Sequence, residues 1–171
     1  MGRELLRRLH NKLLGNKEYY SAMAISLREV TKDNWEDIIL LEITKEQEEF
    51  VALNAESIAG SKFNEHYVNR AIYFNEEPVG FIQYFPNYED EKPNEIYIDQ
   101  FMIDVPHQGK GYGTKAIKLA LDEIKLREDC KAISICYVEG HDVMKGFFER
   151  FNFSVVEQDE FDETIMVLNV A

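Results

Sequence analysis

The sequence of 171 residues is poor in cysteine and contains no long hydrophobic run. Cys130 and Cys136 lack CxxC spacing and nearby histidines, so we expect reduced thiols and neither a disulfide nor a metal site. No stretch approaches the ~18 to 20 apolar residues that cross a bilayer, and the N-terminus lacks the apolar core of a secretory signal. We therefore expect a cytoplasmic protein without an integral membrane segment. The 45% hydrophobic and 12% aromatic content predicts one globular domain.

Basic residues are also scarce, because 19 lysines and arginines stand against 32 aspartates and glutamates, which gives a net charge of −13. Such a surface repels nucleic acid, so we expect no nucleic-acid partner. It also attracts small cations and raises their concentration in any acidic cleft. Solubility alone is the simpler interpretation of the charge, and the charge count by itself favours it.

Residues 1–22 differ from the rest of the chain because basic side chains outnumber acidic ones there. Their leucines recur at helical spacing, which predicts an amphipathic helix with a basic face. This segment could be a surface helix, a dimer contact, a weak membrane-surface segment, or a translated leader that precedes Met23. We expect a basic N-terminal extension over 1–22 and a folded domain over 23–171.

Hydrophobic periodicity predicts a mixed order of strands and helices from residue 25 onward. The expected strands are 25–30, 71–74, 79–85, 96–104, 132–138, 153–157 and 164–170. Helices are expected at 35–41, 45–52, 114–127 and 142–151, residues 54–63 are either helix or loop, and 86–94 is a charged loop with two prolines. This order indicates an α+β protein.

The most informative stretch is IYIDQFMIDVPHQGKGYG, residues 96–113, in which an alternating strand runs into a glycine-rich loop. Gly109, Gly111 and Gly113 leave the backbone N–H groups unshielded in front of a helix expected from about Thr114. Together with that helix N-terminus, they predict a concave anion site suited to a pyrophosphate. The spacing fits neither GxxxxGK[ST] nor GxGxxG, and an ordinary turn needs only one residue with positive φ. Lys110 either adds positive charge near the phosphates or is simply solvated.

The spacing Gln-x-x-Gly-x-Gly, with Gln108, Gly111 and Gly113 in the fixed places, resembles the acetyl-coenzyme A loop of the GNAT superfamily of N-acetyltransferases. The order of expected elements over 25–170 resembles the same superfamily. The resemblance implies a mixed central sheet of about six to seven strands flanked by about four helices, with splayed central strands. It also implies that acetyl-CoA is the cosubstrate.

Three further segments resemble bacterial polyamine N-acetyltransferases of the spermine/spermidine type, namely 27–59, EPVGF at 77–81 and FMID at 101–104. This finer resemblance implies transfer of an acetyl group to a small cationic amine such as spermidine or spermine, and a homodimer is compatible with it. An acetyl-CoA-binding sensor or regulator with little turnover is the alternative. Acetylation of protein N-termini or lysines is less favoured, because the chain has no recognisable peptide-binding insertion.

The resemblance also implies where the cosubstrate binds. Backbone groups of Phe101, Met102 and Ile103 would pair with the pantetheine arm as an added strand does. The pyrophosphate would lie on the loop and the start of the following helix, that is on Gln108, Gly109, Lys110, Gly111, Tyr112, Gly113 and Thr114.

Asp99 is the candidate base, acting directly or through a water molecule, because a charged side chain in mid-strand is costly without a role or a partner. Strict alternation places Asp99, Phe101 and Ile103 on one face of the strand, and Ile98, Gln100 and Met102 on the other. A surface carboxylate, or one paired with a lysine, is the alternative. Glu95 and the acidic run 46–49 could also bind a cationic substrate, although such a run is usually a solvated helix face.

The segment HDVMKGFFERFNF departs from the family pattern. His141 stands where the family has Asn, and Phe148 stands where the family has the Tyr that protonates the departing thiolate. Phenylalanine has no proton to donate. The thiolate could leave unassisted or be protonated by water, Tyr137 could substitute, or the protein could be weak or inactive. His141 could contact the cosubstrate or act in proton transfer, or it could cap the helix.

Overall fold

The computed structural model describes residues 24–48, 50–88, 90–138, 142–158 and 163–170. The predicted extension over residues 1–22 and the candidate residue His141 lie outside the described residues.

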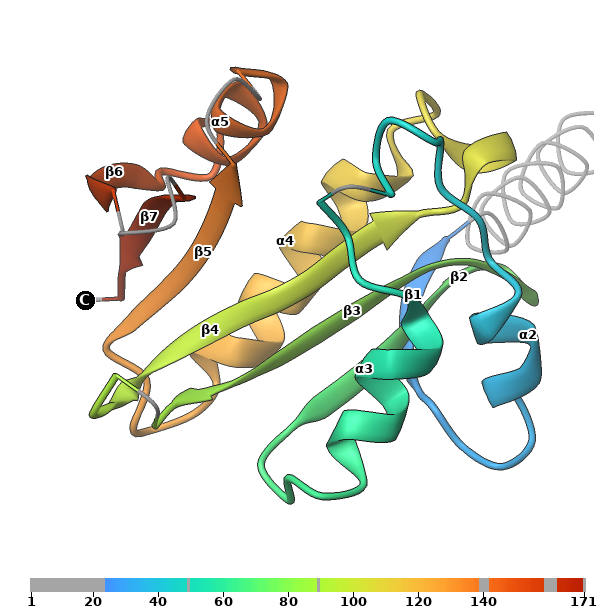
Figure 1. Cartoon of the computed structure of the whole chain (residues 1–171), viewed down its shortest axis with the longest axis horizontal. Coiled ribbons are helices and arrows are strands. Elements are labelled where there is room, and N and C mark those ends of the chain that lie inside the picture. Colours follow the sequence, from blue (N-terminus) through green and yellow to red (C-terminus); the bar gives the residue numbers. More distant parts are fainter. Residues whose placement is uncertain (1–23, 49, 89, 139–141, 159–162, 171) are drawn as a thin grey trace, which may run out of the picture.

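A single mixed sheet organises the domain (Figure 1). Its seven strands lie in the order β1-β2-β3-β4-β5-β7-β6. Their bounds are β1 (Ile25–Glu29), β2 (Val68–Phe74), β3 (Glu77–Asn87), β4 (Lys92–Ile103), β5 (Ala132–Val138), β6 (Ser154–Gln158) and β7 (Glu163–Asn169). All neighbours pair antiparallel except β4 and β5, which are parallel. The predicted mixed sheet is confirmed.

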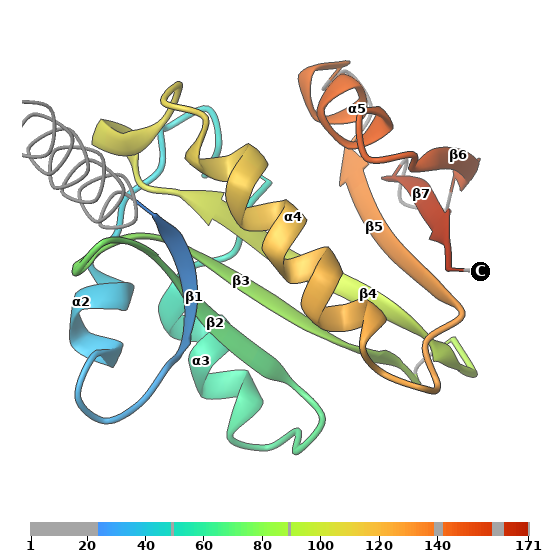
Figure 2. The ribbon, with the colours of Figure 1, turned by 180° about the vertical axis from the view of Figure 1, so that it is seen from behind.

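Helices cover both faces of the sheet, and the predicted number of about four is confirmed for the described residues. They are α2 (Trp35–Ile39), α3 (Asn54–Ser61), α4 (Tyr112–Lys125) and α5 (Asp142–Glu149), with a short 3-10 helix, η1 (Val105–His107). Helices α2 and α3 lie on one face, and α4 crosses the opposite face (Figure 2). No helix in the described part of the chain is long and apolar enough to cross a membrane.

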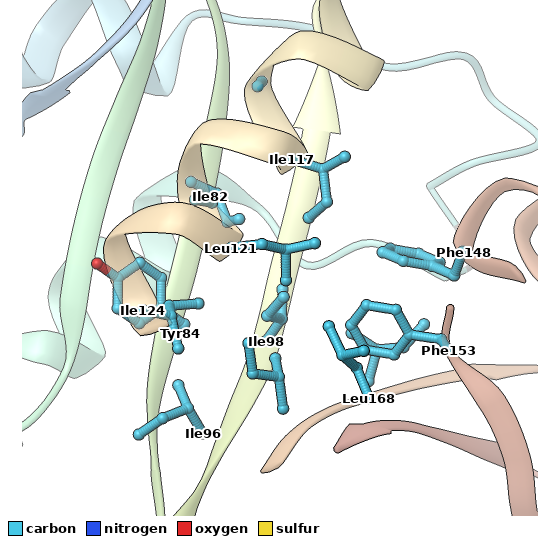
Figure 3. Close-up of a cluster of buried hydrophobic side chains, with 14 of the residues drawn as sticks. Ile82, Tyr84, Ile96, Ile98, Ile117, Leu121, Ile124, Phe148, Phe153 and Leu168 are labelled. Atoms are coloured by element: carbon cyan, nitrogen blue, oxygen red, sulfur yellow. The ribbon is translucent and has the colours of Figure 1, made fainter. Parts of the chain in front are cut away.

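The main core lies between α4 and the sheet (Figure 3). Helix α4 forms here because it has a stripe of apolar residues at helical spacing that is buried, whereas Leu119, outside the stripe, is exposed. The buried residues are Ala116, Ile117, Ala120, Leu121 and Ile124. Phe148 and Phe153 close this core from α5 and the start of β6. A smaller core around Ile38, Phe81 and Met102 lies on the other face. The cores fix β3 and β4 between two layers of helices.

Two predicted segments have a different structure from the one expected. The expected loop 86–94 is mostly strand, because β3 continues to Asn87 and β4 begins at Lys92. Pro86 is tolerated in β3 because the register shifts beside it, at a position where the ladder is interrupted. The expected helix 45–52 is instead a turn over 45–48, in which Gln47 Oε1 accepts a hydrogen bond from the Thr44 N–H at 3.0 Å. This run of like charges has no apolar stripe to bury, so packing does not extend the turn into a helix.

A β-bulge interrupts β4 at Asp99. Gln83 of β3 pairs with Gln100 and Tyr84 pairs with Ile98, so Asp99 is the extra residue of β4 between these two pairs. The prediction of strict alternation is therefore wrong for Ile98. Its side chain packs on the α4 face with Phe101 and Ile103, while Gln100 and Met102 turn to the α3 face.

The central strands splay after the bulge. Parallel pairing of β4 with β5 ends at Ile98 and Ile135. Beyond that point, among the residues that the structure describes, the rest of β4 pairs only with β3 and the rest of β5 only with β7. Figure 1 shows the two strands diverging toward their carboxyl ends. The predicted splay is confirmed, and it leaves an edge of β4 facing away from β3.

Candidate active site

The register of the β3–β4 pair decides which backbone groups of β4 face the splay. The Asp104 N–H donates to the Val79 carbonyl at 2.9 Å, and hydrogen-bonded pairs alternate along an antiparallel ladder. Met102 therefore directs its N–H and C=O toward β3. Phe101 and Ile103 direct theirs away from β3, on the side that β5 has left. These two residues present the strand edge that the predicted pantetheine contacts require.

The glycine-rich loop follows this edge and is held open by its backbone conformation. Gly109 and Gly111 have φ of 71° and 77°, a region that L side chains rarely adopt. A methyl group added at either position would meet no atom within 4 Å, so the space in front of the loop is open. Gly113 differs, because an added methyl group would make ordinary van der Waals contact with Ile103 Cγ1 at 3.5 Å and with Phe101 Cζ at 3.6 Å. The start of α4 therefore lies directly against the end of β4.

Helix α4 begins at Tyr112, two residues earlier than predicted, so its first turn includes Tyr112, Gly113 and Thr114. Gly111 is the N-cap, no side chain caps the helix, and the first turn contains no acidic residue. The N–H groups of this turn and the positive end of the helix dipole are directed at the open loop. The arrangement can hold an anionic phosphate group through main-chain donors. Lys110 is exposed on the loop.

Gln108 ties the loop to its surroundings through its side chain. Its Nε2 donates to the Ile103 carbonyl at 2.8 Å and to Gln47 Oε1 at 2.9 Å. Asp104, at the end of β4, accepts the Glu42 N–H at 2.8 Å and lies 3.1 Å from His107 Nδ1. The fixed glutamine of the motif thus joins the loop, the β4 edge and the turn over 45–48.

A pocket lies where β4 and β5 separate. The residues that line it are Phe50, Val51, Ile98, Asp99, Gln100, Phe101, Ile135, Cys136, Met144 and Phe148. The structure therefore brings together three of the predicted residues, Asp99, Phe101 and Phe148. Asp99 is exposed, whereas Phe148 retains 2% of its surface and packs edge-on against Phe153 at 5.4 Å between ring centroids.

Tyr137 does not line this pocket; it is partly buried against the main core. A tyrosine that the sequence reasoning missed lies closer to it. The Tyr97 hydroxyl is 2.7 Å from Cys136 Sγ, and Cys136 lines the pocket. Burial raises the pKa of the Tyr97 phenol, and the interaction with Cys136 adds to the shift. Burial likewise raises the pKa of the Cys136 thiol to about 12, so both groups keep their protons at neutral pH. No local pattern marks Tyr97 in the sequence, because Cys136 lies 39 positions further along the chain.

A buried hydrogen-bond network supports the wall of the pocket on the α3 side. Gln100 Nε2 donates to the Ala52 carbonyl at 2.7 Å and to Asn54 Oδ1 at 2.8 Å, and its Oε1 accepts from Ser57 Oγ. Gln83 Nε2 donates to the Ser57 carbonyl at 2.8 Å. The network fixes the segment that carries Phe50 and Val51 against the bulged strand. Sequence periodicity could not predict this network, because it does not show which distant residues the side chain of a glutamine in a strand will bond.

Comparisons with known proteins agree with this geometry. The profile described as "Acetyltransferase (GNAT) family" matches residues 25–153. Two proteins of Bacillus subtilis are 30% identical over 149 residues, which is 85% of this chain and 98% of each relative. They are the "Spermine/spermidine N(1)-acetyltransferase" of strain 168 and the "Probable spermine N(1)-acetyltransferase" of subspecies natto strain BEST195. A crystal structure of aminoglycoside acetyltransferase AAC(6')-Ib with coenzyme A has a TM-score of 0.71 at 15% identity, covering 85% of this chain and 95% of that one.

Proposed function

This chain belongs to the GNAT acetyltransferase family, and we propose that its acceptor is a primary amine of a polyamine such as spermidine or spermine. Family membership makes the protein an acetyl-CoA-dependent N-acetyltransferase. The observation that carries the finer proposal is the bulged Asp99 at the mouth of the splay, in a chain with net charge −13. The names of the two Bacillus relatives support the same acceptor class.

We propose that the cosubstrate lies along the splay and the loop. The backbone groups of Phe101 and Ile103 would pair with the pantetheine arm as a neighbouring strand would. The N–H groups of residues 109–114 would bind the pyrophosphate, with Lys110 placed to add positive charge. Met102 would contribute packing in the smaller core, since its backbone groups face β3. Bound in this way, acetyl-CoA supplies the thioester carbonyl that the amine attacks.

Asp99 would accept the proton that the ammonium group must lose before it can attack, directly or through a water molecule. The amine nitrogen then forms a bond to the acetyl carbon, and the carbon–sulfur bond breaks to release the thiolate. Phe148 lines the pocket without a proton to give, and Tyr137 is not among the lining residues. The thiolate would therefore leave without a protein acid and take its proton from water.

Phe148 also favours a second candidate function, a regulator that binds acetyl-CoA with little turnover. Release of free thiol from acetyl-CoA separates the two. Purified protein would be assayed with spermidine, spermine, kanamycin and a monoamine, against a blank without acceptor. Release that depends on spermidine or spermine is expected. Binding of acetyl-CoA without release for any acceptor would contradict the polyamine proposal and favour the regulator.

A further inference from the structure

A second pocket lies on the α3 side of the sheet, near the β3–β4 hairpin, and the reaction described above does not use it. It is lined by Asn64, His66, Tyr67, Phe85, Pro86 and Tyr88. Tyr67 and Phe85 stack with ring centroids 3.9 Å apart and planes within 6°. His66 meets Tyr88 edge-on at 4.9 Å. Four rings from two segments, 66–67 and 85–88, thus surround one small hollow.

Contiguous side chains connect this aromatic pocket with the pocket at the splay. Phe85 meets Tyr97 edge-on with centroids 5.7 Å apart. The Tyr97 hydroxyl in turn lies 2.7 Å from Cys136, which lines the first pocket beside Asp99. Phe85 and Tyr97 pair directly across the two strands and therefore share a face. Figure 1 shows that the end of β3 and the start of β4 extend beyond α3.

The strand geometry sets the separation between the two pockets. Asp99 lies two residues beyond Tyr97, which is about 7 Å along the strand. Phe85 lies one strand away and Tyr67 one strand further, at about 5 Å for each step. The aromatic pocket therefore lies roughly 10 Å from Asp99 along a diagonal path. An extended polyamine with two aminoalkyl units spans a length of this order between its terminal nitrogens.

Carboxylates flank the aromatic pocket. Asn87, next to Pro86, donates through Nδ2 to Asp90 Oδ2 at 3.0 Å and to Glu95 Oε1 at 3.3 Å. Glu95 also accepts from Ser134 Oγ at 2.7 Å. These bonds hold two negative charges beside the ring cluster. Ring faces attract an ammonium group, and the neighbouring carboxylates add a favourable field.

We propose that the pocket formed by Tyr67, Phe85 and Tyr88 holds the far ammonium group of the acceptor while its reacting amine lies beside Asp99. This inference rests on the proposed function and deepens it. The two pockets together would select acceptors by the distance between their terminal nitrogens. Acceptors long enough to reach both pockets are bound more tightly than monoamines or short diamines, which reach only the first.

Steady-state kinetics with spermine, spermidine, 1,3-diaminopropane and propylamine, at saturating acetyl-CoA, test the proposal in the wild-type protein and in Tyr67→Leu and Phe85→Leu. The KM for spermidine is expected to rise about 3- to 30-fold in each variant, the range that follows from the loss of one ring face. The KM for propylamine and the affinity for acetyl-CoA are expected to stay constant. Tyr67→Phe keeps the ring and is expected to restore the wild-type KM.

Phe63→Leu is the matched control, because Phe63 is 85% exposed in the same connecting segment and does not line the pocket. Its KM for spermidine should equal that of the wild type. Acetyl-CoA binding by calorimetry checks that each variant is folded, and calorimetric titration with spermidine gives a second reading of the same pocket. Unchanged spermidine KM and binding in folded Tyr67→Leu would overturn the inference while leaving the polyamine activity intact. Absence of spermidine turnover and binding in the wild type would overturn both.

Discussion

The two faces of the β3–β4 pair are built from different chemistry. On the α4 face, Ile82, Ile96 and Ile98 are almost fully buried among other apolar side chains. On the α3 face, Gln83 and Gln100 are equally buried, yet both amides are hydrogen-bonded to α3 and to the segments beside it. The apolar face anchors the helix whose N-terminus we propose as the binding site of the cosubstrate pyrophosphate. The polar face fixes the wall of the pocket in which we propose that the acceptor binds.

Variants can test whether the two faces act separately. Changes in the glycine loop should alter the affinity for acetyl-CoA, and changes on the α3 side should alter the KM for the acceptor. A variant that changed the affinity for acetyl-CoA and the KM for the acceptor equally would show that the two faces are not independent.

Asp99→Asn should give the largest change. Loss of a general base is typically worth ~10²–10⁴-fold, and kcat for spermidine should fall by that order. Acetyl-CoA affinity, measured by calorimetry, should remain at the wild-type value because the loop is unchanged. Glu56→Gln is the control, since it removes an exposed carboxylate from α3 without touching either pocket. Wild-type kcat in folded Asp99→Asn would remove Asp99 from the mechanism.

Gly111→Glu should weaken acetyl-CoA binding by about 100-fold, because a negative charge would face the pyrophosphate and the left-handed backbone would be strained. Calorimetric titration with acetyl-CoA measures the change. Gly60→Glu places the same side chain on α3, where φ is not positive and an added methyl group meets no atom within 4 Å. That control should bind acetyl-CoA normally. Equal affinities for the two variants would reject the pyrophosphate assignment.

Gln83→Leu and Gln100→Leu compare two buried glutamines of the polar face, of which one lines the pocket and one does not. Each removes a buried amide and leaves its partners unsatisfied, so each should lower the free energy of unfolding by about 1–3 kcal/mol in urea titrations. Only Gln100 lines the pocket, so only Gln100→Leu should also raise the KM for spermidine. A rise of the same size in Gln83→Leu would show that the effect is general destabilisation.

The smallest effect concerns Cys136, whose pKa burial raises to about 12. Because the thiolate is the reactive form, alkylation by iodoacetamide in the folded protein should be slow at pH 7 and should accelerate about tenfold per pH unit up to pH 10. In urea the thiol regains its ordinary pKa, and the rate should level off near pH 9. Mass spectrometry of the Cys136 peptide follows the reaction. A plateau near pH 9 in the folded protein would contradict the buried, protonated thiol.

The apolar face could be predicted from the sequence, and the polar face could not. Helix α4 and strand β5 follow from apolar residues at fixed spacing, and β5 was predicted with its exact bounds, Ala132–Val138. The glycine loop could be predicted because backbone with positive φ, found at Gly109 and Gly111, favours glycine and so marks the sequence locally.

The bulge at Asp99 leaves no such signal, because it depends on the register that β3 imposes on β4. One extra residue places Ile98 on the α4 face and Gln100 on the α3 face, so strict alternation gave the wrong face for Ile98. The network around Gln100 joins residues more than 40 positions apart in the sequence. Pairings of that kind are decided by tertiary packing and not by local pattern.

Amide hydrogen exchange with and without coenzyme A tests most directly whether the cosubstrate binds where β4 and β5 separate. Saturating coenzyme A should slow exchange at the Phe101 and Ile103 amides, which face away from β3. Exchange at Met102 should change little, because its amide already faces β3. Unchanged exchange at Phe101 in protein that demonstrably binds coenzyme A would show that the pantetheine arm does not pair with this edge of β4.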